Sequence, residues 1–438
     1  MRLRDIEIII VCVFLLLTIA EFIQVAVQFR LFGPNLLHYR IWQYLVVIVI
    51  LLNNPKAFTT KSMRIMYLYM AIYFLLAAVG HYVSERYEIV GTSTLSVLPI
   101  SLGVVILMKE HYFRPEKLQD LRLVIRFAWL AYILACITSL VVIFLYPASV
   151  RGTEAGFFRE EARSYRGFGL GGYGFFSSLP FLIPILFYQF KHSLQENWRK
   201  SVYLAALIGL FLFTVYKGVI VAPFLLAVFA LIFSQLGRRR FKANIIVFII
   251  LVIVYVLLPN QIIGGAFLSV ADVVPNRDMS NKFRDIGTSY ISGLDIVEAE
   301  EGSTNTVEHR ASRIMINIEQ FWKNPLIGAG TAGNPHLYWL NLLAQFGLIG
   351  AFPLFWLIWV QFGYLRRFSD DFKFYYILSF VSYVALLFIK ASGGYHFYLA
   401  IFFIVPGSYY LNNSFYPNSP VETDGYTHES PKSARNIA

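Results

Sequence analysis

The sequence predicts an all-α polytopic membrane protein with about twelve transmembrane helices, and two observations lead to this fold class. The first is composition. Of the 438 residues, 57% are hydrophobic and only 14% are charged, whereas a soluble domain carries about 25% charged residues. The second is distribution, because the apolar residues form long runs, many of them near the roughly 20 residues that cross a bilayer. So little charge could not cover a soluble surface of this size.

The apolar runs place the individual spans. Each run ends where charged, glycine or proline residues cluster, which locates the boundaries to within a few residues. The spans form a single transmembrane domain over residues 1–411, and the polar remainder, 412–438, is predicted to be a disordered cytoplasmic tail. The predicted spans cover roughly residues 6–28, 36–52, 65–83, 89–108, 123–146, 171–190, 201–216, 218–236, 243–258, 337–362, 374–389 and 396–411.

The basic residues orient these spans. Lysine and arginine concentrate in alternate short loops, which is typical of cytoplasmic loops. Both termini are therefore predicted to be cytoplasmic, and two long loops, at about 147–170 and 259–335, are predicted to be external. The same distribution accounts for the net charge of +11, so nucleic acid is excluded as a partner. Cys12 and Cys136 lie inside apolar runs and are predicted to be small buried hydrophobic residues.

The first long loop contains two arginines followed by a glycine-rich stretch. Arg163 and Arg166 precede Gly-Phe-Gly-Leu-Gly-Gly-Tyr-Gly, which runs into the sixth span. Glycines let backbone N–H groups approach a ligand closely, and a helix N-terminus favours anions. The segment is therefore a candidate diphosphate cradle. The alternative is a flexible loop whose glycines only allow close helix packing.

The second long loop is predicted to contain a helix with two distinct faces. An apolar stripe at helical spacing consists of Val307, Ala311, Ile314, Ile318 and Phe321. The opposite face carries Arg310, Arg313, Asn317 and Gln320. Two guanidinium groups three residues apart lie side by side and suit a phosphate or diphosphate. The alternative is the solvated face of a surface helix.

Two further residues complete the candidate site. His336 follows Asn334 and Pro335, which can cap and start the tenth span. The positive end of that helix disfavours imidazolium, so a neutral His336 could accept a proton. Lys217 lies in the tight outer turn between the seventh and eighth spans. The alternatives are an interfacial histidine without a role and a lysine that only reaches the membrane surface.

A stretch of the second half of the chain resembles the bacterial O-antigen polymerase and ligase superfamily. An arginine helix beginning Glu308-His-Arg-Ala-Ser-Arg leads into the turn Pro325-Leu-Ile-Gly-Ala-Gly330. A span that His336 opens then carries the pair Gly347 and Gly350. The span number, the positions of the long loops and the Lys217-Gly218 turn are also similar to the family.

The resemblance implies a GT-C-like membrane glycosyltransferase of the inner membrane. Its implied substrate is an undecaprenyl-diphosphate-linked oligosaccharide, and its implied activity is that of a Wzy-type polymerase, inverting and free of metal and cofactor. Arg310, Arg313 and Lys217 would bind the donor diphosphate, Arg163 and Arg166 the second substrate, and His336 would act as base. Membrane lipid and a chain-length regulator protein are the implied partners.

Two other activities remain open at this point. An O-antigen ligase would use the same site with lipid A-core as acceptor, although Leu337 stands where ligases usually carry a polar residue. A polysaccharide flippase or secondary transporter would also have about twelve spans, and such proteins usually show paired repeats and broken helices. The sequence shows no internal repeat, which favours the polymerase.

Overall fold

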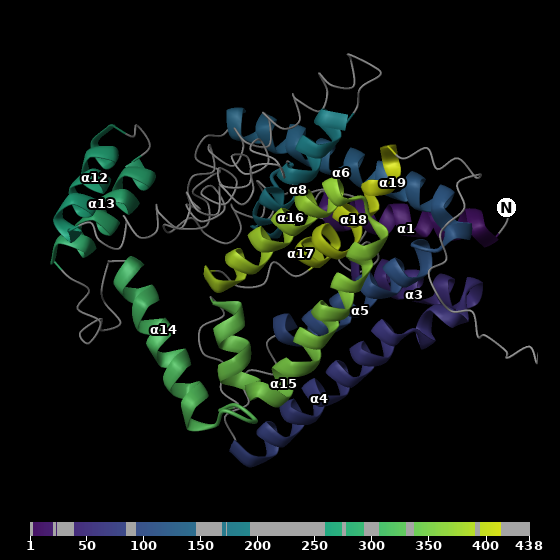
Figure 1. Ribbon diagram of the computed structural model, residues 1–438, viewed down its shortest axis with the longest axis horizontal. Helices are drawn as coiled ribbons and strands as arrows, with labels where there is room; N and C mark the ends of the chain where they lie inside the picture. The colour runs from purple at the N-terminus through teal and green to yellow at the C-terminus, as the bar shows by residue number, and fades with distance from the viewer. Residues whose placement is uncertain are drawn as a thin grey trace, which may run out of the picture.

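In the computed structural model, every regular element among the described residues is helical (Figure 1). The structure describes residues 3–20, 23, 39–84, 93–145, 169–171, 173–192, 259–273, 277–292, 306–329, 337–389 and 395–412. Within them, three helices are long and apolar enough to cross a membrane, at 115–142, 338–367 and 370–388, and 40–53 is a shorter apolar helix. The chain is therefore an all-α protein with the character of a membrane protein.

The helices begin within a few residues of the predicted spans wherever the structure describes them. The spans predicted at 201–216, 218–236 and 243–258, the loop at 147–168 and the tail from 413 lie outside the described residues. The helices are α1 Leu3–Ile19, α3 Tyr39–Asn53, α4 Lys61–Ser84, α5 Ser93–Tyr112, α6 Leu118–Leu145, α8 Tyr173–His192, α12 Asn260–Val273, α13 Arg277–Ser292, α14 Thr306–Lys323, α15 Tyr338–Phe362, α16 Asp370–Ile389, α17 Tyr395–Leu399, α18 Val405–Gly407 and α19 Tyr409–Asn412. The short turns are η1 Pro55–Thr59, η2 Pro115–Lys117, η5 Gly363–Arg367 and the π-helical η6 Ala400–Ile404.

The last described helical segment forms the centre of the bundle. Its residues from 395 to 410 are all buried, and its parts α17, η6, α18 and α19 contact α1, α5, α6, α8 and α16 (Figure 1). Gly407 makes the closest approach, since a Cβ there would lie 2.5 Å from Cδ1 of Ile125 on α6. A helix surrounded on all sides must be apolar all round, which this segment largely is.

A buried polar cluster joins α1, α3, α5 and α6 at one end of the bundle. Glu7 and His111, both fully buried, lie 2.8 Å apart between Oε1 and Nε2. Asn53 donates to the other oxygen of Glu7, and Lys117 lies 3.4 Å from it. Asn54 donates to Nδ1 of His111 over 3.1 Å, so the proton on Nε2 is free to point at Glu7.

The same end gathers the basic residues predicted to be cytoplasmic. Arg4 donates to both oxygens of Asp120, and Arg114 donates to Asn54 over 3.0 Å. Lys109 is also buried there; it donates to Gln361 over 2.6 Å and lies 3.8 Å from the Tyr364 ring centroid. Arg4, Lys109 and Arg114 thus share one end of the bundle. Nothing in the sequence spacing predicts the Glu7–His111 pair.

The second long loop contains more helix than predicted. The expected helix near 307–321 is confirmed as α14, and α12 and α13 precede it as a helical hairpin (Figure 1). Gly264 and Gly287 mark the crossing of that hairpin, because a Cβ on either would lie within 2.8 Å of the other's carbonyl oxygen. Phe267 and Phe283 stack beside it. Having no side chains, these two glycines let the two helices touch.

Candidate functional site

The helix α15 is broken at Gly347, which corrects the prediction of one straight span over 337–362. Gly347 has φ 63° and ψ −167°, outside the helical region. The rings of Trp339 and Phe355 stack with centroids 5.6 Å apart, whereas a straight helix would separate these positions by about 24 Å. Residues 338–346 therefore fold back along residues 348–362 as a re-entrant segment, and Figure 1 shows the sharp change in direction.

The turn at residues 325–328, which follows α14, packs against the backbone at this break. The amides of Leu348 and Ile349 donate to the carbonyls of Pro325 and Leu326, both over 2.9 Å. A Cβ on Gly347 would lie 2.4 Å from the carbonyl of Leu326, and one on Gly328 would lie 2.2 Å from the carbonyl oxygen of Gln345. Both glycines have positive φ. Two separate sequence motifs, the Pro-x-x-Gly turn at 325–328 and the Gly-x-x-Gly pair at 347–350, thus contact each other through their backbones. We call this contact the joint.

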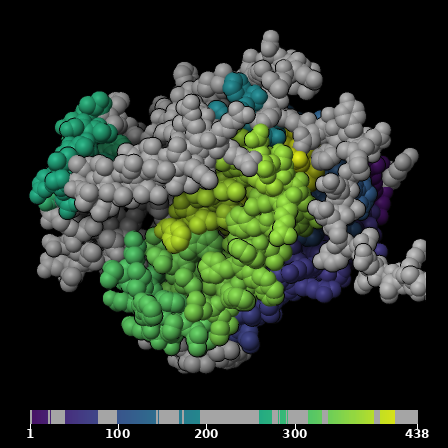
Figure 2. Space-filling model, in the orientation of Figure 1, coloured from purple at the N-terminus to yellow at the C-terminus, as the bar shows by residue number. Residues whose placement is uncertain are grey.

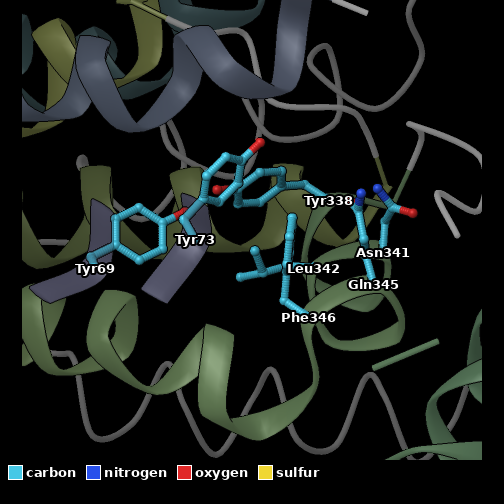
Figure 3. Close-up of a pocket in the computed structure, with 7 residues that line it drawn as sticks. All are labelled: Tyr69, Tyr73, Tyr338, Asn341, Leu342, Gln345 and Phe346. Atoms are coloured by element: carbon cyan, nitrogen blue, oxygen red, sulfur yellow. The ribbon is translucent and has the colours of Figure 1, made fainter. Parts of the chain in front are cut away.

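The re-entrant segment lines a pocket with α4. Its lining residues are Tyr69, Tyr73, Tyr338, Asn341, Leu342, Gln345 and Phe346 (Figure 3). The hydroxyl of Tyr338 lies 3.3 Å from that of Tyr398 on α17. The rings of Tyr73 and Phe346 lie 4.8 Å apart. Aromatic walls with a few polar groups are the usual lining of a small-molecule site.

Several buried amides in this region have no hydrogen-bond partner, as do the amide nitrogens of Gln43 and Gln361 elsewhere in the described residues. Oδ1 of Asn341 and Oε1 of Gln345 are buried without a hydrogen-bond partner in the described part of the chain. The same holds for both side-chain polar atoms of Asn317 and for Oε1 of Gln320, on α14. An unpaired buried polar group costs about 1–3 kcal/mol, and native proteins pair nearly all of them. Four such side chains on two helices in contact indicate a site that something else occupies.

On the polar face of α14, Asn317 turns inward. Asn317 is 1% exposed, whereas Ile314 of the predicted apolar stripe is 37% exposed. Positions 310 and 313 share the Asn317 side of the helix by helical periodicity. The interpretation of this face as a solvated surface is therefore wrong at Asn317. On the face shown in Figure 2, the green surfaces of α14 and α15 adjoin.

The residues predicted to do chemistry are only partly located. Arg163, Arg166, Lys217 and His336 lie outside the described residues. Arg310 and Arg313 belong to the described backbone of α14, and their side chains lie outside the description. Leu337, directly after His336, is 4% exposed and has φ 71°. It begins the re-entrant segment, at the end remote from the Gly347 joint.

Sequence reasoning missed Asn341 and Gln345. Their signal was available, because two amides four residues apart on one helical face interrupt an otherwise apolar run. Comparison with known proteins adds no assignment: no family model, curated protein or solved structure matches the chain.

Proposed function

We propose that this protein is a polysaccharide polymerase that joins undecaprenyl-diphosphate-linked repeat units at the outer face of the inner membrane. In this proposal the chain has about twelve spans in a GT-C-like arrangement, both termini are cytoplasmic, and neither metal nor cofactor takes part. The observation that carries it is the joint between the Gly328 turn and the Gly347 break. The joint holds α14, the helix of Arg310 and Arg313, against the re-entrant segment that lines the pocket. That segment begins at Leu337, directly after His336.

The chemistry requires two things of such a site. The departing diphosphate must be stabilised, and the attacking hydroxyl must lose a proton. Arg310, Arg313 and Lys217 supply positive charge for the diphosphate, and Arg163 and Arg166 hold the second lipid-linked substrate. His336 takes the proton. Arginine suits the diphosphate because its planar fork binds two oxygens at once.

One structural feature favours a second candidate, a flippase or secondary transporter. Such proteins often build their substrate sites from discontinuous helices, and α15 is discontinuous at Gly347. Lipid and polysaccharide analysis of a deletion strain separates the candidates. Loss of a polymerase leaves single repeat units on lipid A-core, loss of a ligase leaves long chains on the carrier lipid, and loss of a flippase leaves units facing the cytoplasm. Either of the last two results would contradict the polymerase.

Alanine at Arg310 and at Arg313 tests the arginine helix in the complemented deletion strain. Each charge-assisted bond to phosphate contributes about 1.5–3 kcal/mol, so at least one single variant is expected to abolish polymer. Lysine at either position should restore polymer formation only in part. It keeps the positive charge but lacks the planar guanidinium group that binds two oxygens at once. Arg284→Ala on α13 is the control, since Arg284 makes an exposed ion pair with Asp272. Full-length polymer from the double alanine variant at normal protein level would contradict the proposal.

The topology has its own test. In a Cys136→Ser background, Ser164→Cys and Ser303→Cys are expected to react with a membrane-impermeant thiol reagent in intact spheroplasts. Arg239→Cys is expected to be protected until the membrane is opened. These outcomes follow from the inside bias of basic residues in the short loops. The reverse labelling pattern would place the long loops in the cytoplasm. It would thereby contradict the proposed mechanism, which requires these loops at the outer face.

A further inference from the structure

The pocket of α15 contains hydrogen-bond acceptors without partners, beside the donor NH₂ groups of the same amides. The unpartnered atoms of Asn341 and Gln345 are both carbonyl oxygens, and these side chains are only 4% and 2% exposed. A carbonyl oxygen can only accept, so its partner must carry an O–H or N–H group. A diphosphate offers acceptors alone at neutral pH and cannot satisfy them. The ligand of this pocket is therefore a hydrogen-bond donor.

The arrangement of the two amides fits a polyhydroxylated ring. Asn341 and Gln345 lie four residues apart, so they project from one side of the re-entrant segment, and Figure 3 shows their amides side by side. The rings of Tyr73 and Tyr338 line the same pocket. A tyrosine ring offers an apolar face with a polar tip, which suits a sugar ring that has C–H groups on its faces and hydroxyls at its edge.

We propose that Asn341 and Gln345 bind the saccharide part of the substrate and help to set which repeat unit is accepted. This inference rests on the proposed function and divides the site in two. The basic residues hold the diphosphate, and the amides of the re-entrant segment hold sugar hydroxyls or N-acetyl groups. Asn317, on the inward face of α14, carries the same unpartnered amide chemistry and extends the saccharide site toward that helix.

Apolar variants of similar shape test the assignment. Asn341→Leu and Gln345→Met remove the acceptors with little change in volume. Each is expected to raise KM for lipid-linked repeat units, extracted from the deletion strain, by about 5- to 10-fold with a smaller effect on kcat. The thermal stability of the purified variants should stay equal or rise, because each variant removes an unpaired buried polar group. A structural role for the amides would instead lower stability.

Gln361→Met is the matched control on the same helix. Gln361 is 1% exposed; its Oε1 accepts a hydrogen bond from Lys109 over 2.6 Å, whereas its Nε2 has no partner among the described residues. Its replacement leaves a buried lysine without that partner, so stability should fall while KM stays unchanged. If Gln345→Met raises KM without loss of stability, and Gln361→Met lowers stability without a change in KM, the role of Gln345 is ligand binding and that of Gln361 is packing.

Direct binding separates this inference from the proposed function. The probe is the repeat-unit glycan released from its lipid by mild acid, and its binding is followed by saturation-transfer NMR. Wild-type protein should bind it, and the double variant should not. If wild type transfers sugar and the double variant keeps the same KM and the same binding, the saccharide assignment is wrong and the polymerase stands. If wild type binds the glycan through these amides but never transfers it, the saccharide site stands and the polymerase is wrong.

Discussion

Gly347→Ala is expected to destabilise the protein by more than about 3 kcal/mol and to abolish its activity. A non-glycine residue with positive φ carries strain of about 1–3 kcal/mol. The added Cβ would also lie 2.4 Å from the Leu326 carbonyl and 2.5 Å from the Gly328 amide nitrogen. Backbone atoms held by hydrogen bonds on both sides cannot move aside cheaply. The readout is the melting temperature of detergent-purified protein, followed by size-exclusion chromatography after heating.

Gly363→Ala provides the control for that substitution. Gly363 follows the same helix, has ordinary helical torsion angles, and a Cβ there would meet nothing within 4 Å. It should melt within a degree or two of wild type. A Gly347→Ala protein as stable as the Gly363→Ala protein would mean that the joint between the Gly328 turn and α15 is not built as described.

His336→Ala is expected to slow transfer by about 10²–10⁴-fold, the usual contribution of a general base. Binding of the lipid-linked donor should survive, since the basic residues supply it. His336→Gln should be almost as inactive as His336→Ala, because glutamine keeps a hydrogen bond and cannot take the proton. The measurement is the initial transfer rate of purified enzyme at pH values from about 5.5 to 8.5, where histidine titrates.

Two results would remove His336 from proton transfer. A wild-type rate independent of pH, together with an active His336→Gln protein, would assign it to orienting a hydroxyl. Normal polymer from both variants would make it a residue without a role. In either case the base would have to be sought among outer-loop carboxylates such as Glu308 and Glu161, which then become the next substitutions.

Hydrophobicity predicted the apolar helices well because a long apolar run has few other ways to satisfy its backbone in lipid. It could not predict the break in α15. Glycine at 347 can adopt helical or left-handed backbone angles. The left-handed angles are selected only by the contact with the carbonyls of the 325–328 turn. The missed hairpin of α12 and α13 has a related cause, since Gly264 and Gly287 lower helix propensity until the two helices pack at these positions.

The candidate site was predicted in part, through its charges. The apolar stripe identified the helix that became α14, but it left open whether the face of Asn317 is solvated or binds a ligand. The amphipathic pattern assumes water outside and an apolar core inside. It fails where a helix lines a polar site within the protein. The roles of Arg163, Arg166, Lys217, Arg310, Arg313 and His336 stay predictions until the variants are measured.

The central position of residues 395–410 has a consequence for biosynthesis. This segment emerges from the ribosome after α1, α5, α6, α8 and α16, the helices that enclose it. Until it is made, those earlier helices lack the segment that they enclose, and Ile125 on α6 lacks its contact with Gly407. The insertion of one late helix then completes the packing of several early ones. Assembly of the bundle therefore requires that residues 395–410 have been made, and a ribosome stalled before residue 395 would leave a bundle without its core.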